Sequence, residues 1–520
     1  MLVADYKPVW SGISAFMKTE KEQCSRLFIL WLLGICLILP LNACQPPYGD
    51  GRRDKGCRMC HSVELDPAHD IGCIECHQGE LAGRTQSVAH QGLISDPAHP
   101  GHMRRVCGRC HEAQVAAAGA SSHFTLSGEL GTVWSAFFPS GQAVSSIENL
   151  PLPADPPVEP AGLVADLMRR RCLRCHVYYR GENYAFIRRG TGCAACHLSF
   201  TINGPSDHRF RKKVSDRHCL ACHYGNYVGW DYYGRFEVDY DQDYHIPLGR
   251  AQGSERPYGL EWHEMRPDIH HTVGMSCCDC HSRGPCEQVT PGKTVIGCTD
   301  CHSAEKRDRL GPSGAWRKPP VMNTLVTGHR AHDVSRVDCV VCHAIWSFRD
   351  TGRALVRQDA PDYETWEYLS IQGSSEIEVV IKTWERLPEY YWIVPRMQDK
   401  VSGAYSTGIW FEGFVQRRWG PVPVAEDRDG RLVVVRPVMD LSLSYVDSSG
   451  DVVFDNLRPV PEDTGYSAER RYRYPYWQPY HPHTIGKADL FRSLFTQMWL
   501  DGLVSADQFL ENGEDLAAGN

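Results

Sequence analysis

The pentapeptide C-x-x-C-H occurs nine times in this chain of 520 residues. Two thiols three positions apart can add across the two vinyl groups of one porphyrin, and the His beside the second thiol then lies under the iron as its proximal ligand. A zinc or thioredoxin-type site needs the C-x-x-C pair but gives no reason for a His after every second Cys. The repeat therefore predicts nine covalently attached c-type haems, and cysteines used only for zinc or disulfides are the alternative.

These pentapeptides are numbered motif 1 to motif 9 in chain order. The predicted attachment residues are Cys57 and Cys60, Cys73 and Cys76, Cys107 and Cys110, Cys172 and Cys175, Cys193 and Cys196, Cys219 and Cys222, Cys277 and Cys280, Cys298 and Cys301, and Cys339 and Cys342. The predicted proximal ligands are His61, His77, His111, His176, His197, His223, His281, His302 and His343.

Fifteen of the 24 His remain after the proximal ligands, enough to give every iron a second His. Candidates for this distal position are His69, His90, His99, His102, His123, His208, His218, His245, His263, His270, His271, His329, His332, His481 and His483. His218 is weak because it adjoins Cys219, and His263 because no motif follows closely. Met ligation would raise the reduction potentials, but Met is scarce, so bis-His ligation and low potentials are expected.

Two spare cysteines lie near motif 7. Cys278 occupies a variable position inside the motif and Cys286 follows it. A disulfide between them is expected in an oxidising compartment. Free buried thiols, or an axial thiolate from Cys286, are the alternatives.

The N-terminal 43 residues are typical of a lipoprotein export signal. Basic residues precede an apolar run from Leu27 to Leu41, which is short for a membrane span. The run ends in Leu41-Asn42-Ala43-Cys44, similar to a lipobox, so Cys44 is the predicted lipidation site. Met17 is the predicted start of translation, and Gln45 after the lipidated Cys favours the outer membrane. An uncleaved helical anchor is the alternative, and both place the chain outside the cytoplasm.

The net charge of -8, made more negative by haem propionates, argues against nucleic acid as a partner. Motif spacing predicts a three-haem domain over 44–138, a Pro-rich linker over 139–162, a six-haem domain over 163–347, and a haem-free β-rich module over 348–520 with a C-terminal helix. The predicted fold class is a multihaem cytochrome c, mostly irregular, with short α-helices around a haem core.

Local patterns predict a few longer elements. Helices are expected over 163–174, 207–217 and 488–500. Strands are expected over 376–384, 405–415, 432–438, 441–446 and 452–454, with a hairpin turn at 447–450.

Several strings together resemble a family of exported multihaem c-type cytochromes, many of them lipoproteins, from metal- and oxyanion-reducing bacteria. They run from Ala68-His69 through motif 2, Ala89 to Ile94, motif 3 and Ser122 to Gly128, and continue in motif 6, Tyr232-Tyr233-Gly234, Gly274 to Cys277 and Pro482-His483-Thr484. The resemblance implies that the distal ligands are His69, His90, His123, His208, His271, His332 and His483. The chain departs from the family where relatives carry further haem motifs, after Trp346 and after Thr484.

Three functions follow as hypotheses, and the sequence favours an electron-transfer protein over an enzyme. In the first, bis-His iron passes electrons without binding substrate, so the chain is a conduit between membrane or periplasmic donors and a partner cytochrome, a porin complex or an extracellular acceptor. In the second it reduces a small oxyanion such as selenite, tellurite, nitrite or a sulfur oxyanion, with donors such as Tyr178, Tyr179 and Arg180 beside an open haem. In the third it is a docking or scaffold subunit of a cytochrome complex.

Overall fold

The computed structural model describes residues 56–201, 203–205, 207–238, 256–281, 297–303, 320–323, 329–363, 369, 372–388, 393–427, 429–460 and 477–503. The predicted export signal, Cys44, His245 and Cys286 lie outside these residues. The chain divides into two compact units, Met1–Val63 with Gly79–Leu93, and Glu64–Gln78 with Ile94–Asn520. Across the described ranges, no helix is long and apolar enough to span a membrane.

The smaller unit contains motif 1. A single 3-10 turn, η1 (Cys57–Met59), carries the motif, and helix α3 (Gln86–Ala89) leads to His90. Gly56 precedes the turn with a φ of 110°, a conformation that favours glycine.

In the larger unit, every motif lies on a short helix, as expected from the sequence. These helices are α2 (Cys73–His77), η2 (Cys107–Arg109), η4 (Cys172–Cys175), α9 (Ala194–His197), α10 (Asp216–Leu220), α12 (Cys277–Cys280), α13 (Thr299–His302) and α15 (Cys339–His343). The short turn places both thiols and the His of a motif on one side of the chain, as attachment to one porphyrin requires.

Other helices connect or cover the motifs. They are α4 (Pro100–Val106), α5 (Glu112–Ala120), α6 (Ser122–Thr125), α7 (Ser127–Phe137), η3 (Ile147–Asn149), α8 (Pro160–Arg170), η5 (Trp230–Tyr233), α11 (Ile269–Thr272), α14 (Ala331–Arg336), α16 (Ser375–Trp384) and α17 (Leu490–Leu500). The predicted helices over 163–174 and 488–500 are confirmed as α8 with η4 and as α17. The helix predicted over 207–217 is wrong for most of its length, because this segment instead bridges to Leu65 at His208.

The β structure is concentrated after residue 346. Strands β6 (Thr351–Gln358), β9 (Ile409–Gln416), β13 (Leu441–Val446) and β14 (Val452–Leu457) form a sheet in the order β14-β13-β6-β9. Strand β6 pairs antiparallel with β9 and parallel with β13, and β13 and β14 form the hairpin predicted around 447–450. A second sheet has the order β11 (Val424–Glu426), β12 (Leu432–Pro437) and β15 (Trp477–Pro479).

Four two-stranded ribbons complete the described strands. They pair β1 (Phe200–Thr201) with β2 (Gly204–Pro205), β3 (Arg235–Glu237) with β4 (Trp262–Glu264), β5 (Ser347–Phe348) with β10 (Trp419–Gly420), and β7 (Arg396–Gln398) with β8 (Tyr405–Thr407).

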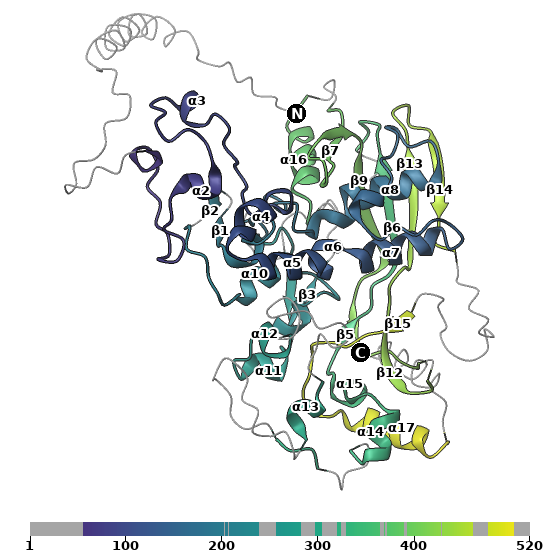
Figure 1. The fold of residues 1–520 in the computed structure, drawn as a ribbon. Coiled ribbons are helices and arrows are strands. Elements are labelled where there is room, and N and C mark those ends of the chain that lie inside the picture. Colours follow the sequence, from purple (N-terminus) through teal and green to yellow (C-terminus); the bar gives the residue numbers. More distant parts are fainter. Residues whose placement is uncertain are drawn as a thin grey trace, which may run out of the picture. The chain divides into compact units, whose positions relative to one another are not determined.

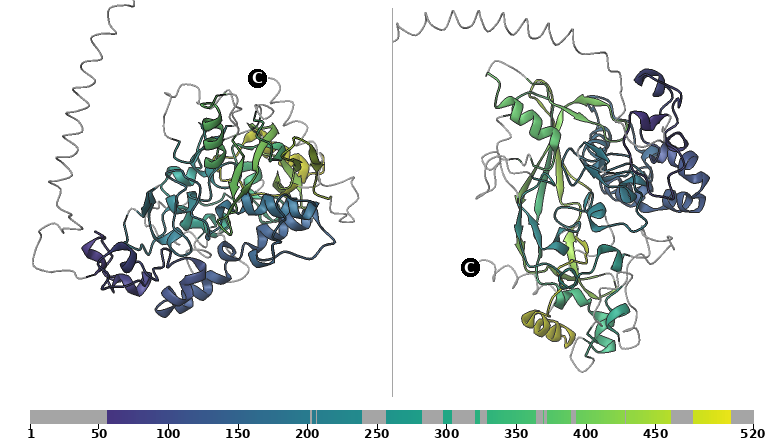
Figure 2. Two further views of the ribbon diagram at one scale, coloured as in Figure 1. Left: turned by 90° about the horizontal axis from the view of Figure 1, so that it is seen from above. Right: turned by 90° about the vertical axis from the view of Figure 1, so that its left-hand side faces the viewer.

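The largest hydrophobic core joins the helices that lead into motif 4 to the four-stranded sheet. Leu163 and Leu167 of α8 pack in one cluster with Trp410 and Phe411 of β9 and Leu443 of β13. Figure 1 shows α7 and α8 beside these strands, and the left view of Figure 2 shows the same arrangement from above. The sheet therefore buries α8, the helix that leads into motif 4.

The strand predicted over 376–384 is wrong, because this segment is helix α16. Ile377 and Ile381 are buried four positions apart, on one helical face, and the hydroxyl of Ser374 caps the helix by accepting the Ile377 amide. The apolar residues Ile377, Val380, Ile381 and Trp384 repeat at helical spacing and pack in the largest core.

Candidate haem sites

All eighteen motif cysteines are thiols, whereas Cys278 is disulfide-bonded. The predicted partner of that disulfide, Cys286, lies outside the described residues. A structural zinc site needs about four ligands in one place, but in the parts of the chain that the structure describes no three His, Cys, Asp or Glu side chains converge on a metal position. The paired thiols and adjacent His of each motif are the donors that covalent porphyrin attachment uses.

Seven of the nine motif histidines face a second His across a gap. The ring centroids are separated by 6.0 Å for His61 and His90, 6.1 Å for His111 and His69, 6.3 Å for His77 and His208, 6.1 Å for His223 and His123, 6.2 Å for His281 and His483, 6.1 Å for His302 and His270, and 6.0 Å for His343 and His329.

This spacing matches one metal ion between two imidazoles. A metal–nitrogen bond of about 2 Å on each side, plus about 1 Å from nitrogen to ring centre, separates the two centroids by about 6 Å. Packed aromatic rings also have centroids about 4.5 to 7 Å apart, and His99 and His102, neither of which belongs to a motif, lie at 5.9 Å, so the spacing is compatible with coordination rather than specific to it. The pairs therefore fit bis-His coordination of iron.

Hydrogen bonds orient several motif imidazoles for this role. The Nδ1 atoms of His77, His197, His302 and His343 lie 2.9, 2.7, 2.8 and 3.0 Å from the carbonyl oxygens of residues 94, 211, 320 and 486. A carbonyl can only accept, so Nδ1 carries the proton and Nε2 is left as the metal-binding nitrogen.

Carboxylates orient two of the opposing imidazoles. Nδ1 of His69 lies 2.8 Å from Oδ2 of Asp66, and Nδ1 of His270 lies 2.8 Å from Oδ1 of Asp268. A carboxylate partner fixes the ring and makes Nε2 a stronger donor to a metal.

Five of the distal ligands implied by the family resemblance occur among the seven pairs: His69, His90, His123, His208 and His483. His271 instead packs edge-on against Tyr232 and Tyr233, at centroid distances of 5.3 and 4.6 Å. Its neighbour His270 faces His302. The side chain of His332 is not among those described, and His329 faces His343.

In the part of the chain that the structure describes, a His that interacts with motif 5 lies at a position that the sequence ranked as weak. His218 lies near enough to His197 for the two to interact electrostatically, although desolvation is the main cause of the lowered pKa of His218. Its Nδ1 lies 2.8 Å from the Ser215 hydroxyl, which leaves Nε2 available.

Motif 4 differs from all the others. The His176 side chain is 1% exposed, neither ring nitrogen has a hydrogen-bond partner, and burial lowers its pKa to about 3. Its ring neighbours are Tyr178 at 5.5 Å and Tyr179 at 6.4 Å. A buried, neutral imidazole without partners is costly, and iron on Nε2 would supply one.

Cysteines of different motifs interact in a pattern that connects motifs 2 to 9. Hydrogen bonds join the thiols of Cys107 and Cys193, of Cys219 and Cys277, and of Cys298 and Cys339. The Cys222 thiol donates to the Cys175 carbonyl at 3.1 Å. Electrostatic interactions place Cys76 near Cys107, Cys196 near Cys219, and Cys280 near Cys301.

The neighbours in the larger unit are therefore motifs 2 and 3, 3 and 5, 5 and 6, 6 and 7, 7 and 8, and 8 and 9, with motif 4 attached to motif 6. Arg189 strengthens that last link, because its guanidinium donates to carbonyls of both motifs, at 2.8 Å to Arg174 and 3.1 Å to Ala221. This order could not be read from the sequence, in which motif 4 precedes motif 5.

No family model, no curated protein and no solved structure matches this chain in the comparisons with known proteins.

Proposed function

We propose that the chain is a nine-haem c-type cytochrome that conducts electrons between redox partners. Haem c supplies a one-electron ferric/ferrous couple at each motif when it is attached. The observation that carries the proposal is the set of seven opposed His pairs at 6.0 to 6.3 Å. Two imidazoles fill both axial positions of an iron, which suits electron transfer and leaves no position for a substrate.

The contacts between motifs support a continuous route. Haems attached at motifs whose cysteines interact would be held close to one another. Hydrogen-bonded thiols connect motifs 3 and 5, 6 and 7, and 8 and 9, and electrostatic interactions connect motifs 2 and 3, 5 and 6, and 7 and 8. The chain's own residues set this order, since Asp216 of α10 accepts the Cys277 amide at 3.0 Å and thereby fixes motif 7 beside motif 6.

The proposal includes the location and partners predicted from the sequence. A lipid on Cys44 would tether the exported chain to the outer membrane, and the donors and acceptors would be other redox proteins, including a partner cytochrome or a porin complex. Many basic side chains lie near the motifs in the sequence, and they would pair with the negatively charged propionates of the haems.

Haem content and spin state test the proposal together. The purified protein is expected to contain nine haems, and His123→Ala is expected to convert one low-spin iron to high spin in the EPR spectrum, because His123 faces His223. His263→Ala is the matched control, since its exposed ring contacts Trp419 and no motif His. An unchanged spectrum in His123→Ala, or a haem count far below nine, would contradict the proposal.

A second function, reduction of a small oxyanion, is favoured by motif 4 alone. No described His faces His176 at the 6 Å spacing, and motif 4 is a branch from the series rather than a step within it. An open sixth position at the end of a branch would receive electrons without blocking the route past it.

EPR distinguishes the two functions at this motif. If the wild-type protein gives the EPR signal of a single high-spin iron, and this signal changes when nitrite or selenite is added, the result would support the reductase. His99 is the described His nearest in electrostatic terms to His176, so His99→Ala is the discriminating variant. A high-spin signal that appears only in His99→Ala would identify His99 as the sixth ligand and leave the conduit as the better function.

A further inference from the structure

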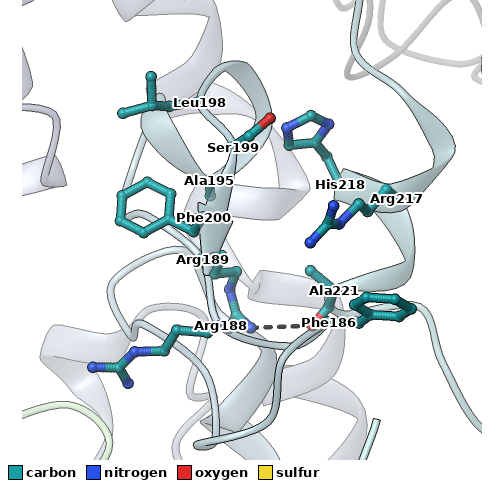
Figure 3. A pocket seen from close by; sticks show the side chains of 10 residues that line it. All are labelled: Phe186, Arg188, Arg189, Ala195, Leu198, Ser199, Phe200, Arg217, His218 and Ala221. Carbon is teal, nitrogen blue, oxygen red and sulfur yellow. Dashed lines mark hydrogen bonds between the residues drawn. The ribbon is translucent and has the colours of Figure 1, made fainter. Parts of the chain in front are cut away.

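The pocket between motifs 5 and 6 is too small to admit a redox partner. It has room for about one water molecule. Figure 3 shows that Arg189, one of its cationic residues, donates to the Ala221 carbonyl, at 3.1 Å. Contact with a partner therefore requires the outer surface of the chain.

The outer face of helix α17 exposes a line of large apolar side chains. Leu490, Leu494 and Met498 are 75%, 58% and 39% exposed, and Leu503, just beyond the helix, is 70% exposed. Residues four positions apart lie one above the other on a helix. Single apolar residues are common on protein surfaces, whereas a contiguous apolar patch is typical of an interaction site. These four residues are called the apolar stripe.

The opposite face of α17 is fixed to motif 9. The Asp489 amide donates to the Cys342 carbonyl at 2.9 Å, and the Thr496 hydroxyl lies 3.5 Å from the Cys342 thiol. Trp499 packs in one core with Val340 of α15, and Figure 1 shows α17 beside α14 and α15. A helix is about 10 Å across, so the apolar stripe lies roughly one helix diameter from the second attachment thiol of motif 9.

The size of the apolar stripe favours a transient partner over a permanent one. Helix α17 has 11 residues and is therefore about 16 Å long. A stable protein pair buries about 800 Å² on each partner, from roughly 20 to 30 residues a side, which four side chains do not supply. Transient redox encounters use smaller contacts. A stable dimer of this chain through the stripe is therefore disfavoured.

Charges at the ends of the apolar stripe indicate the chemistry of the partner. Asp489 caps the helix by accepting the Arg492 amide at 2.8 Å, and its side chain is still 46% exposed. Asp501 is exposed at the other end, and Lys487 is an exposed cation before the helix. Helices that lie on membranes carry Lys and Arg beside their apolar face, whereas two carboxylates repel lipid phosphates. With a net charge of -8 on the whole chain, a partner with a basic rim is complementary.

We propose that the apolar stripe of α17 is the docking surface for a small redox protein that carries a basic rim around an apolar patch at its redox centre. This inference rests on the proposed function, because motif 9 must carry haem for an electron to cross. Motif 9 is the last motif in the series of interacting motifs of the larger unit, next to motif 8. A partner on the stripe thus meets the end of the route: motif 9 loses one electron, and the partner's oxidised centre gains it.

The experiment measures how fast the reduced protein passes electrons to a basic monohaem cytochrome c that has lysines around its exposed haem edge. The wild type is compared with Leu494→Gln, which makes the middle of the stripe polar, and with Leu494→Met, which keeps it apolar. Leu152→Gln is the control for position, an equal change at a 79% exposed leucine outside the stripe. Haem content, the EPR spectrum and the rate with ferricyanide, a small oxidant that needs no docking surface, are measured on every variant.

Leu494→Gln is expected to lower the second-order rate constant with the cytochrome at least about tenfold, because a polar group at the centre of a small contact removes much of its binding energy. Its haem content and its rate with ferricyanide stay unchanged, and Leu494→Met and Leu152→Gln behave as the wild type. Equal rates in the wild type and Leu494→Gln, or no reduction of the cytochrome by the wild type, would overturn the docking surface. A wild type that lacks haem or does not reduce ferricyanide would instead contradict the proposed function, and the docking surface with it.

Two other occupants of the apolar stripe give results of their own. A second copy of the chain would appear in sedimentation as a wild-type dimer that Leu494→Gln converts to a monomer. A lipid surface would appear as binding of Cys44→Ser, which lacks the predicted lipid, to phosphatidylglycerol vesicles, and this binding would be lost when Leu494→Gln is added. Either result would overturn the assignment of the stripe to a redox partner.

Discussion

At the scale of single residues, Asp66 is expected to tune one haem through His69. Burial opposes ionisation of this carboxyl group, but hydrogen bonds from His69 and the Phe210 amide outweigh it and hold its pKa below the usual value. Asp66→Asn removes the negative charge behind His69, which disfavours ferric iron. One haem potential is therefore expected to rise, by a tenfold change in the reduction equilibrium or about 59 mV.

The exposed acid Glu64, two residues away, provides the control, since Glu64→Gln should leave every potential unchanged. Redox titration followed by visible spectroscopy resolves the difference. Equal titration curves for the wild type and Asp66→Asn would show that His69 is not an iron ligand.

Residue spacing predicts the attachment sites but only part of the opposing ligands. His270 and His271 are adjacent on a helix, so about 100° of rotation separates their side chains, and pattern alone does not choose between them. The choice is made by Asp268, which caps α11 by accepting the His270 amide at 2.7 Å and also binds His270 Nδ1. The signal in the sequence that favours His270 is an Asp two residues before it. Asp66, three residues before His69, marks that His in a similar way.

At the scale of elements, the junction of α8 with the sheet depends on a buried carboxylate of β9. Glu412 binds Arg171 at 2.7 Å, just after α8, and Arg353 of β6 at 2.6 Å. Burial alone would raise its pKa, but Arg353 and Arg171 together hold that pKa far below the usual value. The depressed pKa stabilises the fold above about pH 4, the pKa of Glu in an unfolded chain, and this contribution is lost as the pH falls further.

Glu412→Gln is expected to destabilise the folded protein by about 3 kcal/mol at neutral pH, because it leaves buried arginine charge uncompensated. The difference from the wild type should shrink as the pH is lowered below about 4. Chemical denaturation followed by tryptophan fluorescence measures both effects, with Glu112→Gln on the surface of α5 as the control. A loss that is the same at pH 3 and pH 7 would contradict the assigned role.

The elements also show where sequence patterns were sufficient. The strands β12, β13 and β14 and the helix α17 were predicted correctly, because the spacing of their apolar residues and the turn residues that flank them indicate the same elements. The helix α16 was mistaken for a strand although Ile377, Val380, Ile381 and Trp384 follow helical spacing in the sequence and pack in one core, so the signal was available there.

At the scale of the whole molecule, the order of the motifs in the larger unit would determine the route of electrons under the proposed function. Asp216 connects motif 6 to motif 7, because it accepts hydrogen bonds from the Cys277 amide and the Tyr233 hydroxyl and so holds α10 against α12. Asp216→Ala is expected to retain nine haems and the wild-type EPR spectrum but to slow electron transfer between motif 6 and motif 7. The reason is that the two attachment turns separate while every iron keeps its ligands.

Photoreduction followed by internal redistribution of electrons measures this rate. Asp207→Ala, which loses contacts to Arg209 and Arg211, the local turn and an electrostatic interaction with His208, should redistribute electrons between motifs 6 and 7 at the wild-type rate. If Asp216→Ala also does so, electrons do not cross between motifs 6 and 7, and the smaller set of motifs 2 to 6 would have to function separately from motifs 7 to 9. Such a division would make motif 6, with its branch to the buried His176, the end of a route rather than its middle.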